Sequence, residues 1–194
     1  DCPDFKCLNN QLNFTEGTLM PETYFYNFNS PASNILIKSQ DSFIEYAELL
    51  WEKKQPSNPL KTLDEAIILA SIVEKEAGNN KEKPIIAGVF LNRLNLNMRL
   101  QADPTIIYGL LPNFNGNITK LNLQDSSNRY NTYKIKGLPP TPIAMISKSS
   151  LEAVILGIPN NYVYFVAKGD GTHYFSIKYS DHLKAVRKFQ LNKL

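Results

Sequence analysis

The sequence predicts an α+β fold that is mostly helical, with a small antiparallel sheet near the C-terminus. Apolar residues recur at helical spacing in several segments of the chain. Residues 161–177 alternate aromatic and β-branched side chains around a glycine-containing turn, which is typical of a β-hairpin. The 194 residues, 43% of them hydrophobic, are enough for one globular domain with a substantial core.

The chain divides into an irregular N-terminal segment, residues 1–40, and a main domain, residues 41–194. Within the first segment, EGTLMPETYFYN mixes turn formers with aromatic residues and predicts a strand or a packed loop. The first helix is predicted from Asp41, over DSFIEYAELLWEKK, and QPSNP ends it.

Two further helices follow. The strongest helix signal is TLDEAIILASIVEKEAG, in which Thr62 or Asp64 can cap the start and Gly78 can end the helix. The next segment, KPIIAGVFLNRLNLN, predicts a helix with Pro84 in its first turn.

The second half of the chain is more irregular. Residues 98–147 are rich in Asn, Pro and Gly, with interleaved tyrosines, and a loop-rich region of this length is usually functional. A short helix, SSLEAVILGI, precedes the predicted hairpin. A final helix, SDHLKAVRKFQLNKL, is predicted with Ser180 as its cap.

Composition excludes several classes of protein. The net charge of +3 and the lack of any long Lys/Arg block argue against nucleic acid as a partner. No stretch approaches 18 consecutive apolar residues, so this chain is not expected to span a membrane. Because it opens on DCPDFKC instead of an initiator Met, we expect it to be a fragment of a longer protein.

Metal ligands are scarce. The chain has two cysteines, Cys2 and Cys7, at a spacing that does not match a zinc pair, and two histidines, His173 and His182. We therefore expect no metal site and no cofactor. The cysteines could form a local disulfide in an oxidising compartment or remain as two free thiols.

Two glutamates at the end of the second predicted helix differ in position. On a helical wheel Glu76 falls among Leu69, Ile72 and Val73, whereas Glu74 falls nearly opposite. We expect Glu74 to be a solvated surface residue. A carboxyl group on an apolar face is costly to ionise, so the pKa of Glu76 should be raised, as in a general acid for glycosidic bond cleavage.

An alternative interpretation of Glu76 stays open on this evidence. The side chain could reach solvent at the edge of the core, or it could form an ion pair with Arg93 or Arg99. Either arrangement would be structural, not catalytic.

Four motifs in register resemble the endolytic murein transglycosylase family, the MltG/YceG-like proteins. They are ASIVEKEA, VFLNRLNLNMRLQADPTIIYG, YNTYKIKGLPPTPIA and YVYFVAKGDGTHYFS, and EGTLMPETYFY resembles the family's entry to its catalytic domain. The likeness extends from about Glu16 to the C-terminus, and it identifies residues 41–194 as a catalytic transglycosylase domain. It implies a lysozyme-like helical fold.

The resemblance also implies an activity. The family cleaves the MurNAc–GlcNAc β-1,4 bond within peptidoglycan glycan strands and leaves 1,6-anhydro-MurNAc ends, a reaction expected to terminate elongation of nascent strands. Its catalytic glutamate matches the second glutamate of IVEKE, which is Glu76. Ala77 and Ala102 stand where threonine is expected, and neither departure removes an ionisable group.

Lytic cleavage needs one carboxyl group, acting first as acid and then as base. A muramidase that hydrolyses the same bond would usually need a second carboxylate, and Asp103 is the nearby candidate. We prefer a structural or sugar-binding role for Asp103. The alternatives are such a muramidase, or a non-catalytic glycan-binding module of the cell-wall synthesis machinery.

Substrate-binding candidates combine flat aromatic rings with amides and guanidinium groups that can reach sugar hydroxyls and N-acetyl groups. The substrate-binding candidates are Gln101, Asn131, Tyr133, Asn92, Arg99, Asp103, Tyr108 and Tyr130. His173, in the predicted hairpin, is instead expected to be a structural residue.

The family also suggests a location. Its members carry an upstream LysM-like domain and a membrane anchor, which are absent from this chain. We therefore expect a parent protein tethered to the inner membrane, with this domain in the periplasm. The expected partners are glycan strands of peptidoglycan and peptidoglycan synthases.

Overall fold

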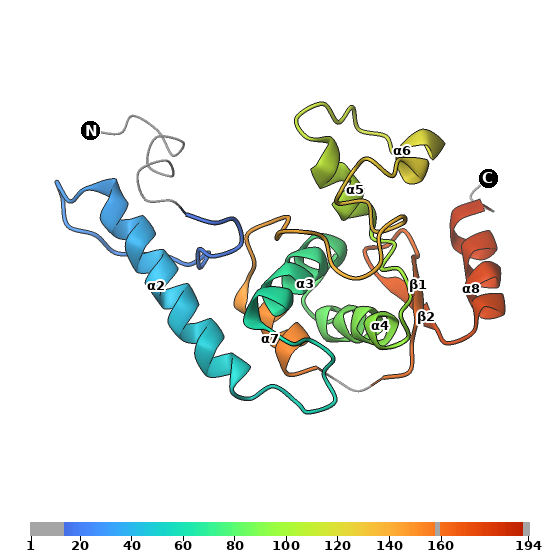
Figure 1. Cartoon of the computed structure of the whole chain (residues 1–194), viewed down its shortest axis with the longest axis horizontal. Coiled ribbons are helices and arrows are strands. Elements are labelled where there is room, and N and C mark those ends of the chain that lie inside the picture. The colour runs from blue at the N-terminus through green and yellow to red at the C-terminus, as the bar shows by residue number, and fades with distance from the viewer. Residues whose placement is uncertain (1–13, 158–159, 192–194) are drawn as a thin grey trace.

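The computed structural model describes residues 14–157 and 160–191, and the chain is mostly helical with a two-stranded antiparallel sheet near the C-terminus (Figure 1). The prediction of the fold class is therefore confirmed. Among the described residues, no helix is both long enough and apolar enough to cross a bilayer. Cys2 and Cys7 lie outside the described residues.

Three helices form the centre of the molecule: α3 (Leu63–Glu76), α4 (Lys83–Asn95) and α7 (Lys148–Ile155) (Figure 1). Leu69 and Phe90 are fully buried where these helices meet. Burial of large apolar side chains is the main favourable term in such a core. The glutamate-bearing helix α3 is therefore held in the core by its packing against α4 and α7.

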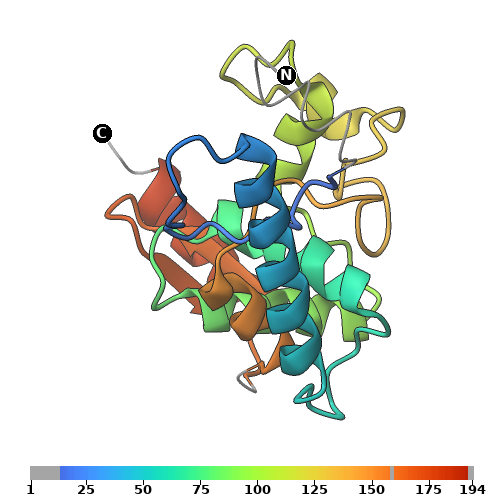
Figure 2. The ribbon, with the colours of Figure 1, turned by 90° about the vertical axis from the view of Figure 1, so that its left-hand side faces the viewer.

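The long helix α2 (Ala32–Trp51) flanks this centre, as Figures 1 and 2 show. It begins nine residues before the predicted start at Asp41, so residues 1–40 are not irregular throughout. The extra turns make a tertiary contact: the hydroxyl of Ser39 donates to the carbonyl of buried Met20 at 2.9 Å. This contact joins segments 19 residues apart, so helical periodicity alone could not reveal it.

The two ends of α3 test the predicted start and end of this helix. The side chain of Thr62 accepts a hydrogen bond from the backbone N–H of Glu65, which confirms one of the two predicted caps. The helix ends at Glu76, and Ala77 follows in extended conformation. Gly78 does not have the positive φ of a helix-ending glycine, and a Cβ there would lie 2.7 Å from the carbonyl oxygen of Gly171.

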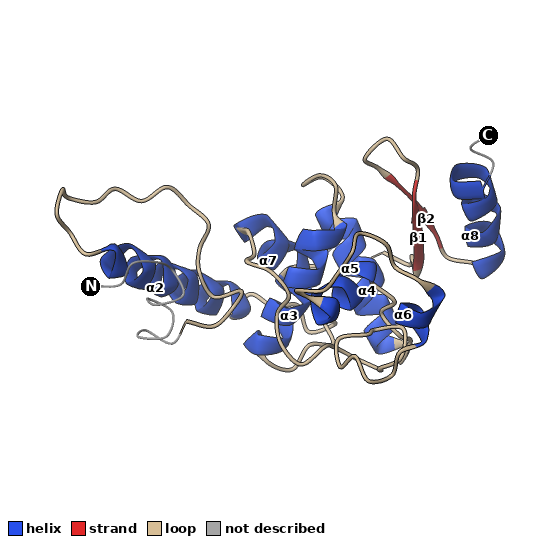
Figure 3. Ribbon diagram, turned by 90° about the horizontal axis from the view of Figure 1, so that it is seen from above, coloured by secondary structure: helices blue, strands red, loops and turns tan. Residues whose placement is uncertain are grey.

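The loop-rich segment contains two short helices, α5 (Asp103–Leu110) and α6 (Lys120–Gln124), which lie above α3 and α4 in Figure 1 and are drawn in blue with the other helices in Figure 3. The hairpin follows α7, and its strands β1 (Tyr164–Ala167) and β2 (His173–Ser176) pair antiparallel.

The C-terminal helix α8 (Tyr179–Val186) packs on the hairpin and continues into a π-helical turn, η1 (Arg187–Leu191). Lys178, which contributes no side-chain hydrogen bond, occupies the cap position. The prediction of Ser180 as the cap is therefore wrong, because the helix begins one residue before it.

Candidate active site

Glu76, the last residue of α3, opens into a cleft of about 450 Å³. Three other parts of the chain line the cleft. The first is α4, the second is the start of α5 with the loop that contains Tyr133, and the third is the hairpin together with α8. The principal lining side chains are Arg93, Gln101, Asp103, Tyr133, Tyr164 and His182. A cleft of this volume can hold one or two sugar rings or a ligand segment of similar size.

The electrostatics of Glu76 favour a protonated carboxyl group. Burial raises the pKa of Glu76 to about 7, the negative charge of Asp103 adds to the increase, and the positive charge of Arg93 opposes it. Within the described residues, no ion pair joins Glu76 to Arg93 or Arg99. A carboxyl group with a pKa near 7 can give up a proton and take one back at neutral pH.

Arg93 is buried and directs its hydrogen bonds to the backbone. Its Nε donates to the carbonyl of Val163 at 2.7 Å, and its guanidinium also donates to the carbonyl of Leu100. The guanidinium lies 5.8 Å from the ring centroid of Tyr164. Arg93 therefore joins α4 to the segments before α5 and β1, and so holds two walls of the cleft together.

Asp103 and Tyr133 form a polar pair on one wall. The phenol of Tyr133 donates to Oδ1 of Asp103 at 2.7 Å. Burial raises the pKa of Tyr133, and the hydrogen bond to Asp103 raises it further. Beside this pair, exposed Gln101 has a φ of 50°, an uncommon conformation for a non-glycine residue. Gln101, Asp103 and Tyr133, all predicted from the sequence, are therefore brought together with Glu76.

Two other predicted residues lie in the scaffold. The buried side-chain amide of Asn131 donates to the carbonyls of Asn122 and Asp125 at 3.0 and 2.7 Å. Asn92 donates to the carbonyls of Asn160 and Tyr162 at 2.8 and 2.9 Å. Neither residue is part of the lining of the Glu76 cleft.

The remaining predicted residues also lie away from that lining. The phenol of Tyr108 donates to Glu16, and its ring centroid is 4.8 Å from that of Tyr130. The hydroxyl of Tyr130 shares a hydrogen bond of 2.7 Å with the hydroxyl of Thr141. Arg99 is exposed outside the cleft.

Sequence reasoning missed the contribution of the C-terminal helix. Tyr164, Tyr179 and His182 line the cleft, and His173 lies there as well, with Nδ1 2.8 Å from Oε2 of Glu82. The spacing of Tyr179 and His182, three residues apart, was a usable signal because it places both side chains on one face of a helix.

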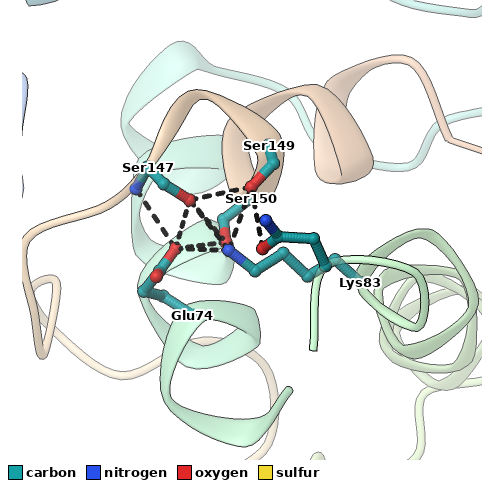
Figure 4. A network of polar contacts seen from close by, with 6 residues as sticks. Glu74, Lys83, Ser147, Ser149 and Ser150 are labelled. Carbon is teal, nitrogen blue, oxygen red and sulfur yellow. Dashed lines mark hydrogen bonds and ion pairs between the residues drawn. The ribbon is translucent and has the colours of Figure 1, made fainter. Parts of the chain in front are cut away.

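The prediction that Glu74 is a solvated residue is wrong, because its carboxylate lies in a network of polar contacts (Figure 4). Its Oε2 accepts hydrogen bonds from Nζ of Lys83 at 3.0 Å and from the hydroxyl of Ser147 at 2.6 Å. The backbone N–H of Ser147 and the hydroxyl of Ser150 donate to the same oxygen. Burial alone would raise the pKa of Glu74, but the hydrogen bonds from Ser147, Ser150 and Lys83 outweigh it and lower the pKa to about 2.

The donors to Glu74 come from the start of α7, more than 70 residues further along the chain, and from Lys83 on α4. A helical wheel of α3 contains neither element, which is why the wheel gave the wrong environment. The result is an ion pair between buried Lys83 and partly buried Glu74 that ties three helices together. In residues 14–157 and 160–191, no three Asp, Glu, His or Cys side chains are grouped so that they could hold a metal ion.

The fold and the cleft together define a mostly helical protein with a candidate acid–base site built on one glutamic acid. The chain belongs to the YceG-like family, whose model matches residues 4–188. A crystal structure of a YceG-like protein from Listeria monocytogenes superposes with a TM-score of 0.74 at 34% identity, over 91% of this chain and 58% of that one.

Two relatives carry a functional name. A protein of Bacillus subtilis, named endolytic murein transglycosylase, is 35% identical over 92% of this chain and 49% of its own length. A protein of the same name from Streptococcus pneumoniae is 30% identical over 92% of this chain and 33% of its own length. The chain thus spans about half of the first relative and a third of the second.

Proposed function

We propose that this domain is an endolytic lytic transglycosylase that cleaves the MurNAc–GlcNAc β-1,4 bond within glycan strands of peptidoglycan. The observation that carries the proposal is the carboxyl group of Glu76, whose pKa is raised to about 7 in a cleft of about 450 Å³. Membership of the YceG-like family and the name of the two relatives support the same substrate class.

In the proposed mechanism Glu76 acts twice. Its protonated carboxyl group first donates a proton to the glycosidic oxygen as the bond to C1 of the muramic acid breaks. The acetamido group of that sugar stabilises the developing positive charge at C1. The carboxylate then takes the proton from the C6 hydroxyl as its oxygen attacks C1. The anhydro ring closes, Glu76 is protonated again, and no water is consumed.

The surroundings of Asp103 favour this lytic route over hydrolysis. Its carboxylate is exposed and accepts the hydrogen bond of Tyr133, so it is engaged in orienting that wall of the cleft. Its negative charge raises the pKa of Glu76 and so helps to keep the acid protonated. We assign Asp103, Tyr133 and Gln101 to substrate binding and positioning, and Glu76 to catalysis.

Mass analysis of the products tests the proposal directly. Purified peptidoglycan incubated with this chain should release fragments that end in 1,6-anhydro-MurNAc, each lighter by one water than the product of a muramidase. Fragments with reducing ends would show hydrolysis and overturn the lytic mechanism. Intact strands that are bound but not cut would favour a glycan-binding module.

The cellular setting is a further part of the proposal. We infer a membrane-tethered parent protein whose catalytic part faces the cell wall, in the periplasm where the organism has one, and which ends strands made by peptidoglycan synthases. Thiol counting on unreduced protein isolated from that compartment tests the oxidising setting, because Cys2 and Cys7 would then be paired. Two free thiols would contradict that part of the proposal.

A further inference from the structure

Three aromatic rings gather on the wall of the cleft formed by the hairpin and α8. The ring of Tyr164 stacks on the imidazole of His182, with centroids 5.3 Å apart and planes 23° apart. The ring of Tyr179 lies 5.6 Å from that of Tyr164 and 6.2 Å from that of His182. These three rings, which we call the aromatic platform, all line the same cleft as Glu76.

Tyr179 is the exposed ring of the platform, whereas Tyr164 and His182 are partly buried. The side chain of Tyr179 is 57% exposed although it lies within a ring cluster. An aromatic face offers considerable apolar area at a small cost in side-chain entropy, because only two side-chain torsions must be fixed. The Asp103–Tyr133 wall is polar instead, because it offers a carboxylate, a phenol and the nearby side-chain amide of Gln101.

His182 adds a polar group to the platform. Its Nδ1 is buried and has no hydrogen-bond partner among the described residues, so a proton there would be an unpaired buried donor. The proton is therefore assigned to Nε2, the nitrogen that is open to a partner. Burial lowers the pKa of His182, and the charge of Arg93 lowers it further, so the imidazole is a neutral donor at neutral pH.

A pyranose ring has the matching chemistry. One of its faces consists of C–H groups and packs on the negative face of an aromatic ring, while its rim carries hydroxyl and acetamido oxygens that accept hydrogen bonds. A peptide side chain or a nucleobase could also stack on a flat ring. The lining of this cleft, however, is polar on one wall and aromatic on the other. A sugar matches both walls, because it has an apolar face and a polar rim.

We propose that the aromatic platform of Tyr164, Tyr179 and His182 is a sugar-binding subsite, which stacks one N-acetylated pyranose ring of the glycan next to the ring cleaved at Glu76. His182 Nε2–H donates to an oxygen on the rim of that sugar. The subsite rests on the proposed function, since it takes the glycan strand as the ligand of the cleft. It makes the C-terminal helix a determinant of substrate binding.

The test measures binding separately from cleavage. The Glu76→Gln chain is titrated with purified glycan strands from which the stem peptides have been removed, and the affinity is followed by calorimetry. Adding Tyr179→Ala should weaken binding about tenfold, the equivalent of losing one good stacking contact. Adding Tyr179→Phe should leave the affinity close to that of the parent, because the ring face is retained.

A matched control is Tyr174 on β2, the strand of the hairpin that precedes α8. Tyr174 is 40% exposed, its ring lies 6.1 Å from that of Phe189, and it does not line the cleft. Tyr174→Ala should leave glycan affinity unchanged. His182→Phe keeps a ring in the platform but removes the donor, so it should weaken binding about fivefold, as expected for one hydrogen bond.

A fluorescence measurement gives an independent readout. The chain contains one tryptophan, Trp51, which lies on α2. Tyr179→Trp should bind at least as tightly as the parent, and the added tryptophan should change its emission on titration with the strands. Emission that stays constant through saturation would place the sugar away from the platform.

The remaining outcomes separate this inference from the proposed function. Affinity unchanged by Tyr179→Ala, or lost equally in Tyr179→Phe, would overturn the stacking subsite. Release of anhydro products by the wild type, with no measurable binding by the Glu76→Gln chain, would overturn the subsite and leave the activity intact. The expected binding pattern without any anhydro product would retain the subsite and overturn the activity.

Discussion

Glu74 and Glu76 lie two residues apart on one helix, yet their surroundings push their pKa values in opposite directions. Four donors hold Glu74 ionised, with a pKa of about 2. Glu76 has no ion pair in the described part of the chain, and burial raises its pKa to about 7. One carboxylate serves as a structural anchor and the other is available for chemistry.

The comparison shows that burial does not by itself decide protonation. Desolvation raises the pKa of both glutamates, but only Glu74 meets enough donors to outweigh it. Lys83 and the start of α7 supply those donors (Figure 4). The anchor fixes the last turn of α3 against α4 and α7, and Glu76 is part of that same turn.

The largest expected effect concerns activity. Glu76→Gln should lower the rate of anhydro-product release by about 10² to 10⁴-fold, the usual contribution of a general acid–base group. Glu74→Gln, assayed well below its melting temperature, should keep most of the activity because Glu74 does not line the cleft. Mass analysis of muropeptides measures both variants. An active Glu76 variant beside an inactive Glu74 variant would reverse the assignment.

The second effect concerns stability. Glu74→Gln leaves buried Lys83 without its ion pair and should destabilise the fold by about 2 to 3 kcal/mol at pH 7, less than for a fully buried pair because Glu74 is partly exposed, as measured by denaturant unfolding. Because the folded pKa of Glu74 is depressed, its contribution is complete above about pH 4.5 and is lost as the pH falls toward 2. Glu22→Gln, which removes the exposed ion pair with Lys148, is the control and should cost about 0 to 1 kcal/mol.

The third effect is also a change in stability, but removing the carboxyl group of Glu76 should stabilise the fold where removing that of Glu74 destabilises it. A carboxyl group with a raised folded pKa favours the folded state below about pH 4.5, and this advantage is lost as the pH rises toward 7. Glu76→Gln should therefore stabilise the protein at pH 8, by on the order of 2 kcal/mol, and change little at pH 4. Thermal melting at the two pH values measures the difference. A loss of stability at pH 8 would indicate that an ionised Glu76 is part of a structural pair.

The smallest effect is a shift in a pH profile. In the wild type kcat/KM should fall above about pH 7 as Glu76 loses its proton. Asp103→Asn removes a negative charge but keeps an acceptor for Tyr133, so the fall should move to lower pH by a fraction of a unit. Asp181→Asn is the control, because this carboxylate on α8 pairs with Lys184 and does not line the cleft, and it should leave the profile in place. A shift to higher pH in Asp103→Asn would contradict the proposed coupling.

Local patterns in the sequence determined much of the framework. The cap at Thr62, the proline in the first turn of α4, the hairpin and the apolar stripe beside Glu76 were all predicted correctly, because each depends on residues close together in the chain. The family motifs also selected Gln101, Asp103 and Tyr133, which the fold places in the Glu76 cleft.

Only the tertiary structure decided which polar residues meet. Asn131 and Asn92 hold backbone carbonyls instead of lining the cleft, and the part of α2 before Asp41 contacts Met20 through Ser39. Such contacts join residues far apart in sequence, and periodicity contains no information about them. The sequence by itself therefore determined that Glu76 lies on the apolar face of α3, whereas packing against α4 and α7 decided that Glu74, two residues earlier, is an ionised anchor and not a solvated side chain.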